Sequence, residues 1–132
     1  MTGFPLKIVT PDGLEFEGMA ESLTVRTVTG DMGIMAKHAD CVAPLGMGQA
    51  TLVVNGQKRY AACIGGMVSI IGGVVNLVPT TFEWADEIDV ERAEASEKRA
   101  QAVLANKNAT DTEIQLAKAR LRRALVRKNV RR

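Results

Sequence analysis

The sequence is poor in the side chains on which enzymes and nucleic-acid readers usually depend. Its 132 residues include one histidine, His38, two cysteines and only 4% aromatic residues. One histidine and scattered serines do not provide a nucleophile, a base and an orienting partner, so we predict no catalytic residues. So few aromatics also leave too few platforms for stacked bases, which argues against nucleic-acid binding.

The sequence also shows no metal-binding cysteine pattern, no signal peptide and no long apolar helix. Cys41 and Cys63 lack metal-ligand spacing, so we predict no metal site and interpret both as small hydrophobic residues in a reducing compartment. Residues 1–20 lack a basic start followed by an apolar block, which predicts no signal peptide and a cytosolic chain. Residues 61–79 carry no charge, but glycine pairs interrupt them, so we expect two strands rather than a membrane helix.

The first part of the chain has the pattern of short β-strands. Two-residue turns are expected at Asn55-Gly56 and Gly72-Gly73, because a type I′ hairpin requires positive φ at both central residues. Leu23, Val25 and Thr27 share one face of an alternating segment. We predict strands over 6–9, 14–18, 23–28, 51–54, 57–61, 67–71 and 74–78. Together they predict an antiparallel β-sandwich over residues 1–84.

The remaining residues, 85–132, have helical signals instead. Asp89 is placed to cap a first helix and is followed by Glu91 in the first turn, where negative charge is favoured. Thr110 and Glu113 form a capping box for a second helix. A short loop between two helices favours an antiparallel αα-hairpin, so the predicted fold class is α+β.

The predicted contact between these helices is rich in alanine. The expected apolar stripe of the second helix consists of Ile114, Ala117, Leu121, Ala124 and Leu125. An alanine seam buries little area for each residue, so the docking of the two helices should be marginal. We therefore expect a hairpin that can open.

Charge is distributed unevenly although the net charge is only +2. No acidic residue follows Glu113, and the basic face of the second helix includes Arg122, Arg123, Arg127 and Lys128. This face is either a solvated helix surface or a site for an acidic partner. A small nucleic-acid-binding domain that uses this helix is the alternative, but the sandwich shows no basic stripe beside it.

Several motifs, in order and spacing, resemble the epsilon subunit family of bacterial F-type ATP synthases over essentially the whole chain. They are residues 8–13 (IVTPDG), 30–34 followed by His38 (GDMGI…H), 42–45 (VAPL), 65–67 (GGM) and 88–93 (IDVERA). The family usually has Pro-Gly before the histidine and proline two residues after it. This chain has Ala36-Lys37 and Asp40 there, which leaves the loop less constrained.

The resemblance implies a rotor subunit rather than an enzyme. Its sandwich would pack on the gamma subunit, and the loop from Gly30 to Leu45 would face the membrane-embedded c-ring. The loop residues that match are Gly30, Asp31, Met32, Gly33, Ile34 and His38. The hairpin would extend into the alpha/beta catalytic head through its basic helix and block ATP hydrolysis. Such a protein is peripheral on the cytoplasmic face of the bacterial membrane, without insertion.

Family members that bind ATP place it between the two helices. The matching residues here are Glu83, Ile88, Asp89, Arg92, Ala93, Arg99, Arg123 and Arg127. By this resemblance, the adenine would contact Glu83, Asp89 and the backbone near Ile88. The phosphates would contact the arginines. Without the resemblance, Asp89 and Arg92 are interpreted as no more than a helix cap and an exposed ion pair. No phosphate-cradling glycine loop or metal carboxylates accompany the site, so we expect ATP to be a regulatory ligand that is not hydrolysed, with no cofactor required.

Overall fold

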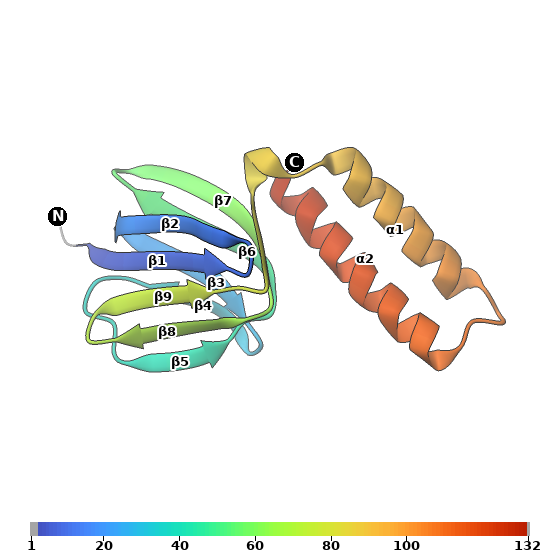
Figure 1. The fold of residues 1–132 in the computed structure, drawn as a ribbon, viewed down its shortest axis with the longest axis horizontal. Helices are drawn as coiled ribbons and strands as arrows, with labels where there is room; N and C mark the ends of the chain where they lie inside the picture. The colour runs from blue at the N-terminus through green and yellow to red at the C-terminus, as the bar shows by residue number, and fades with distance from the viewer. Residues whose placement is uncertain (1–2, 132) are drawn as a thin grey trace. The chain divides into compact units, whose positions relative to one another are not determined.

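The computed structural model describes residues 3–131 and divides into two compact units, Met1–Trp84 and Ala85–Arg132 (Figure 1). The first unit consists of strands and the second of helices, in agreement with the predicted α+β class.

The first unit is a sandwich of two five-stranded sheets, with strand orders β2-β1-β9-β8-β5 and β10-β7-β6-β3-β4. The strands are β1 (Phe4–Thr10), β2 (Gly13–Ala20), β3 (Ser22–Thr27), β4 (Gly30–Ile34), β5 (Cys41–Pro44), β6 (Met47–Val54), β7 (Gln57–Ile64), β8 (Met67–Ile71), β9 (Val74–Val78) and β10 (Thr81–Trp84). The strand pairings are antiparallel, apart from that of β1 with β9, which is parallel. The predicted β-sandwich is confirmed.

Alternating side chains form the core between the sheets. Leu23, Val25 and Thr27 of β3 all point inward and are buried, as their spacing predicts. Cys63 joins this core, where burial raises the pKa of its thiol to about 12 and keeps it protonated at neutral pH. Cys41 is a half-buried free thiol, so only one of the two cysteines is a core residue.

The two tight turns have the predicted backbone. Asn55 and Gly56, between β6 and β7, have φ of 52° and 76°. Gly72 and Gly73, between β8 and β9, have φ of 58° and 80°. These positive values at both central positions set the register of each hairpin.

The prediction of one long loop from Gly30 to Leu45 was wrong. Gly30–Ile34 is strand β4, which pairs with β3, and Cys41–Pro44 is strand β5, which pairs with β8. The actual loop between them is 35–40. Glycines weaken the strand pattern of β4, but its alternation still buries Ile34 completely. The side chain of Ile34 therefore supports the loop from the core and offers no contact surface.

A hydrogen bond fixes the loop that lacks the two prolines. The backbone N–H of Gly72, in the turn between β8 and β9, donates to Oδ1 of Asp40 at 2.9 Å. Lys37 turns the chain with a φ of 66°. A side-chain contact to a neighbouring turn thus constrains this loop where proline rings would have done so.

The second unit contains a short 3₁₀ turn, η1 (Ala85–Glu87), and the helices α1 (Val90–Ala105) and α2 (Asp111–Arg131). The helices run antiparallel (Figure 1). The Asp89 Oδ1 accepts from the backbone N–H of Arg92 at 3.0 Å, which confirms the predicted cap. Thr110 and Glu113 exchange two hydrogen bonds of 3.2 Å, which confirms the capping box. Neither helix, over the described residues, is long and apolar enough to span a bilayer.

Gly66 provides a test of the sandwich. It has a φ of 94°, and a Cβ there would overlap the carbonyl oxygen of Val78 and lie 2.6 Å from Cα of Pro79. Gly66→Ala should lower the free energy of unfolding by about 3 kcal/mol, from backbone strain plus overpacking. Gly56→Ala is the control, since its φ is 76° but nothing lies within 4 Å, so its loss should be about 1–2 kcal/mol. Urea denaturation of the full chain measures both, and equal losses would contradict the packing.

Candidate anion-binding groove

The two helices meet through small side chains. Ala93 and Ala100 of α1 and Ala117 and Ala124 of α2 are buried, seven residues apart on each helix. Leu125 is 41% exposed, so its place in the predicted apolar stripe was wrong. The seam is narrower than the predicted stripe, because of the stripe residues only Ala117 and Ala124 are buried while Ile114 and Leu121 are half-buried.

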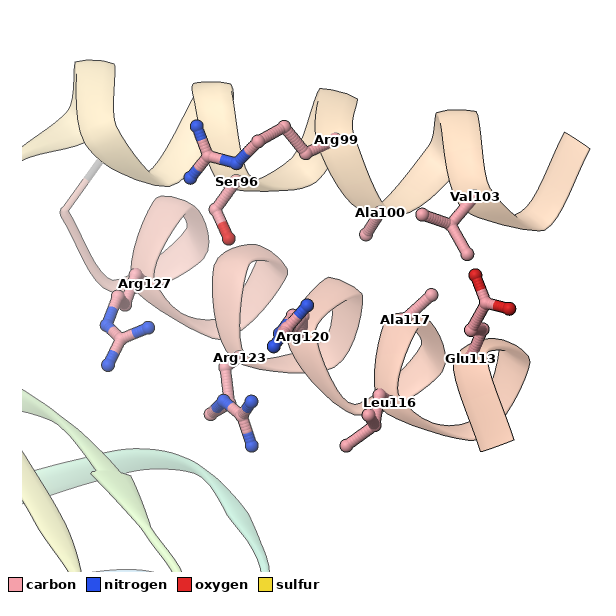
Figure 2. A pocket seen from close by; sticks show the side chains of 10 residues that line it. All are labelled: Ser96, Arg99, Ala100, Val103, Glu113, Leu116, Ala117, Arg120, Arg123 and Arg127. Atoms are coloured by element: carbon pink, nitrogen blue, oxygen red, sulfur yellow. The ribbon is translucent and has the colours of Figure 1, made fainter. Parts of the chain in front are cut away.

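A groove with a volume of about 430 Å³ runs along one side of this seam (Figure 2). Side chains from both helices line it: Ser96, Arg99, Ala100, Val103, Glu113, Leu116, Ala117, Arg120, Arg123 and Arg127. Figure 2 shows Ala100 and Ala117 between the helices and the Ser96 hydroxyl pointing from α1 toward α2. The groove therefore has a small-residue floor and guanidinium groups along its walls.

The groove contains three of the arginines that the sequence nominated. Arg99 comes from α1, and Arg123 and Arg127 come from α2, where they are one turn apart. Arg120 is a fourth lining arginine that the sequence prediction did not include. It lies one turn before Arg123, on the same helix face, so helical spacing was a signal that could have found it.

The other nominated residues have different surroundings. Arg92 is exposed in the first turn of α1 and does not line the groove, and Asp89 is the cap of the same helix. Ile88 is buried and Ala93 belongs to the seam. Glu83 lies on β10 in the other unit.

The charged side chains that line the groove are mainly arginines. Guanidinium groups remain charged at any physiological pH and bind phosphate or carboxylate oxygens through pairs of N–H donors. Glu113 is the one acidic side chain among the residues that line the groove, and its Oε1 already accepts from the backbone N–H of Thr110. The groove can therefore hold a multiply charged anion. Within residues 3–131, no three His, Cys, Asp or Glu side chains are grouped as metal ligands.

The nominated basic face of α2 is divided in the folded hairpin. Arg123 and Arg127 line the groove, whereas Arg122 is exposed and does not. Lys128 Nζ donates to both carboxylate oxygens of Glu97 on α1, at 3.1 and 3.3 Å. These side chains are 32% and 16% exposed, so the ion pair is better shielded than a typical surface pair. This contact would have to break before Lys128 could meet a partner.

The nominated residues of the first unit cluster on β4 and the loop after it. Asp31 Oδ1 pairs with Nε of Arg26 at 3.2 Å, and Met32 packs partly against the core. Gly33 is exposed on β4 and Gly30 begins that strand. The His38 Nδ1 lies 2.8 Å from the carbonyl oxygen of Ala39, so its imidazole is held within its own loop.

Comparisons with known proteins match both units. Residues 3–85 match the family model for the β-sandwich domain of the ATP synthase delta/epsilon chain, and residues 86–130 match its long α-helix domain. The ATP synthase epsilon chain of Bacillus velezensis is 40% identical over 95% of this chain and 94% of its own length. The epsilon chain of Shouchella clausii is 35% identical over 98% of this chain and 96% of its own.

A solved structure shares the fold. A chain in the cryo-EM structure of the Euglena gracilis mitochondrial ATP synthase OSCP/F1/c-ring assembly superposes with a TM-score of 0.82. The match covers 92% of this chain and 77% of that one, at 22% identity. The arrangement of strands and helices is therefore retained although most side chains differ.

The Glu97–Lys128 ion pair provides a test of the hairpin. Either Glu97→Ala or Lys128→Ala should destabilise the helices by about 1 kcal/mol, because the partner keeps a partly desolvated charge. The exchange of both charges, Glu97→Lys with Lys128→Glu, should recover most of that loss. Circular dichroism during thermal unfolding measures the helices, and Lys98→Ala, at an exposed neighbour, is the control. A charge-exchanged variant that is no more stable than either alanine variant would show that the pair does not stabilise the hairpin.

Proposed function

As this chain belongs to the epsilon chain family of ATP synthases, we propose that it is a non-catalytic central-stalk subunit of an F-type ATP synthase. It couples the gamma subunit to the membrane c-ring and stays peripheral on the cytoplasmic face of the bacterial membrane. Similarity over both units, rather than over one domain, carries this proposal.

The ring-facing surface is formed by β4 and the loop 35–40. The exposed residues there are Asp31, Gly33 and Met35, and Met35 is 66% exposed. Buried Ile34 anchors this surface to the core, and the hydrogen bond from Gly72 to Asp40 fixes the end of the loop. An apolar side chain held on a constrained loop is suited to contact another protein.

The hairpin is the regulatory element. Its alanine seam buries little area, so the folded form is only marginally favoured over an open one. When the helices separate, Lys128 loses Glu97 and the basic face of α2, including Arg122, is presented to an acidic segment of the alpha/beta catalytic head. In that position the helix obstructs ATP hydrolysis.

ATP stabilises the folded hairpin without being hydrolysed. Four arginines in one groove repel each other, and a triphosphate converts that repulsion into charge-assisted contacts. The phosphates lie along the arginines, and the base lies toward the start of α1, near Ile88 and Asp89. Saturation to a hundred times the dissociation constant adds roughly 2.7 kcal/mol, enough to shift a marginal equilibrium.

Nucleotide binding is tested by titration calorimetry on the full chain. ATP should bind, and Arg123→Gln should weaken it roughly tenfold or more, since a hydrogen bond to a charged group contributes about 1.5–3 kcal/mol. Arg122→Gln is the matched control because Arg122 is adjacent but outside the groove. Absence of heat at millimolar ATP would remove the nucleotide from the proposed function.

Inhibition is tested by returning the chain to an ATP synthase catalytic complex stripped of it. Added protein should lower ATP hydrolysis, and the inhibition should weaken as ionic strength rises from low salt to several hundred millimolar, because the proposed contact is between opposite charges. A chain ending at residue 84, which lacks both helices, should bind without inhibiting. Inhibition that is unaffected by salt would contradict the role of the basic face.

A further inference from the structure

We propose that Arg120 is a phosphate-binding residue of the groove that acts on the third phosphate of a nucleoside triphosphate. The inference rests on the proposed nucleotide site and adds to it a residue outside the motif that suggested the site. Arg120 lines the groove together with the arginines nominated from the sequence, and Figure 2 shows it on α2 between Arg123 and Ala117.

The spacing along α2 suits an extended anion. Arg120, Arg123 and Arg127 share one face, and with a rise of 1.5 Å per residue the first and last are separated by about 10 Å along the helix. Linked phosphates can follow the row, with Arg99 of α1 on the opposite wall.

The direction of the helices places Arg120 at the end of the phosphate chain. α2 runs antiparallel to α1 (Figure 1), so Arg127 lies toward the start of α1 and Arg120 lies further from it (Figure 2). With the base near Asp89, the phosphates extend from Arg127 past Arg123 to Arg120. A diphosphate ends before Arg120, and only a triphosphate reaches it.

Glu113 marks where the anionic part of the groove ends. It also lines the groove, seven residues before Arg120, and the backbone N–H of Thr110 donates to its carboxylate. A phosphate beyond Arg120 would approach this fixed negative charge. The residues of α2 thus define a site limited in length, and Arg120 is the last cation within it.

Calorimetric titrations of the full chain with ATP, ADP and inorganic tripolyphosphate test this role. Arg120→Gln should weaken ATP binding roughly tenfold or more while ADP binding changes less than twofold. Arg123→Gln should weaken both nucleotides, because Arg123 lies in the middle of the row. Arg122→Gln is the matched control with unchanged affinities, and tripolyphosphate should compete with ATP on the unmodified chain. Circular dichroism verifies that each variant retains its helices.

The outcomes separate this inference from the nucleotide site itself. If Arg123→Gln weakens ATP but Arg120→Gln does not, the nucleotide site stands and the role of Arg120 is overturned. Equal losses for ATP and ADP in Arg120→Gln would also overturn it, since Arg120 would then meet an inner phosphate. If the unmodified chain binds no ATP, the nucleotide site and the role of Arg120 both fail.

Discussion

Alanine packing between α1 and α2 is the constraint on which the behaviour of this chain depends. A buried methyl group contributes roughly 0.8 kcal/mol, whereas a buried leucine or isoleucine contributes about 1.5–3 kcal/mol. The sandwich core contains many of the larger residues, including Leu6, Ile8 and Leu77, while the hairpin seam relies on residues such as Ala100 and Ala117. The sandwich therefore buries more apolar area per residue than the hairpin, which is why the proposed function assigns the opening to the hairpin.

Charged side chains of the hairpin affect the balance between its folded and open forms in opposite directions. The Glu97–Lys128 pair favours the folded hairpin, and the row of arginines in the groove opposes it unless an anion is present. In the proposed function the same α2 side chains have two uses, because Arg123 and Arg127 line the groove when the helices are together and would meet a partner when they separate. In that proposal ligand and partner compete for one set of charges, so the binding of one opposes the binding of the other.

Local signals in the sequence predicted much of this structure. The caps at Asp89 and Thr110 and the turn at Asn55-Gly56 were correct because side chain–backbone bonds and positive φ are properties of a few neighbouring residues. Strand β4 was missed because its glycines weaken the strand pattern, although it pairs with the adjacent β3, and β5 was missed because its partner β8 is distant in the sequence. Arg120 was missed for a related reason: alanines of equal size permit several registers between helices, so which arginines share a groove is decided by packing.

Native-state hydrogen exchange on the isolated full chain tests the central claim most directly. If the alanine seam makes the hairpin a separately opening element, the amides of α1 and α2 should exchange with a much smaller free energy than those of the sandwich strands. ATP should increase protection in the helices and leave the strands unchanged. If helices and strands exchange with one common free energy, with or without ATP, the hairpin opens only by global unfolding and the proposed switch is contradicted.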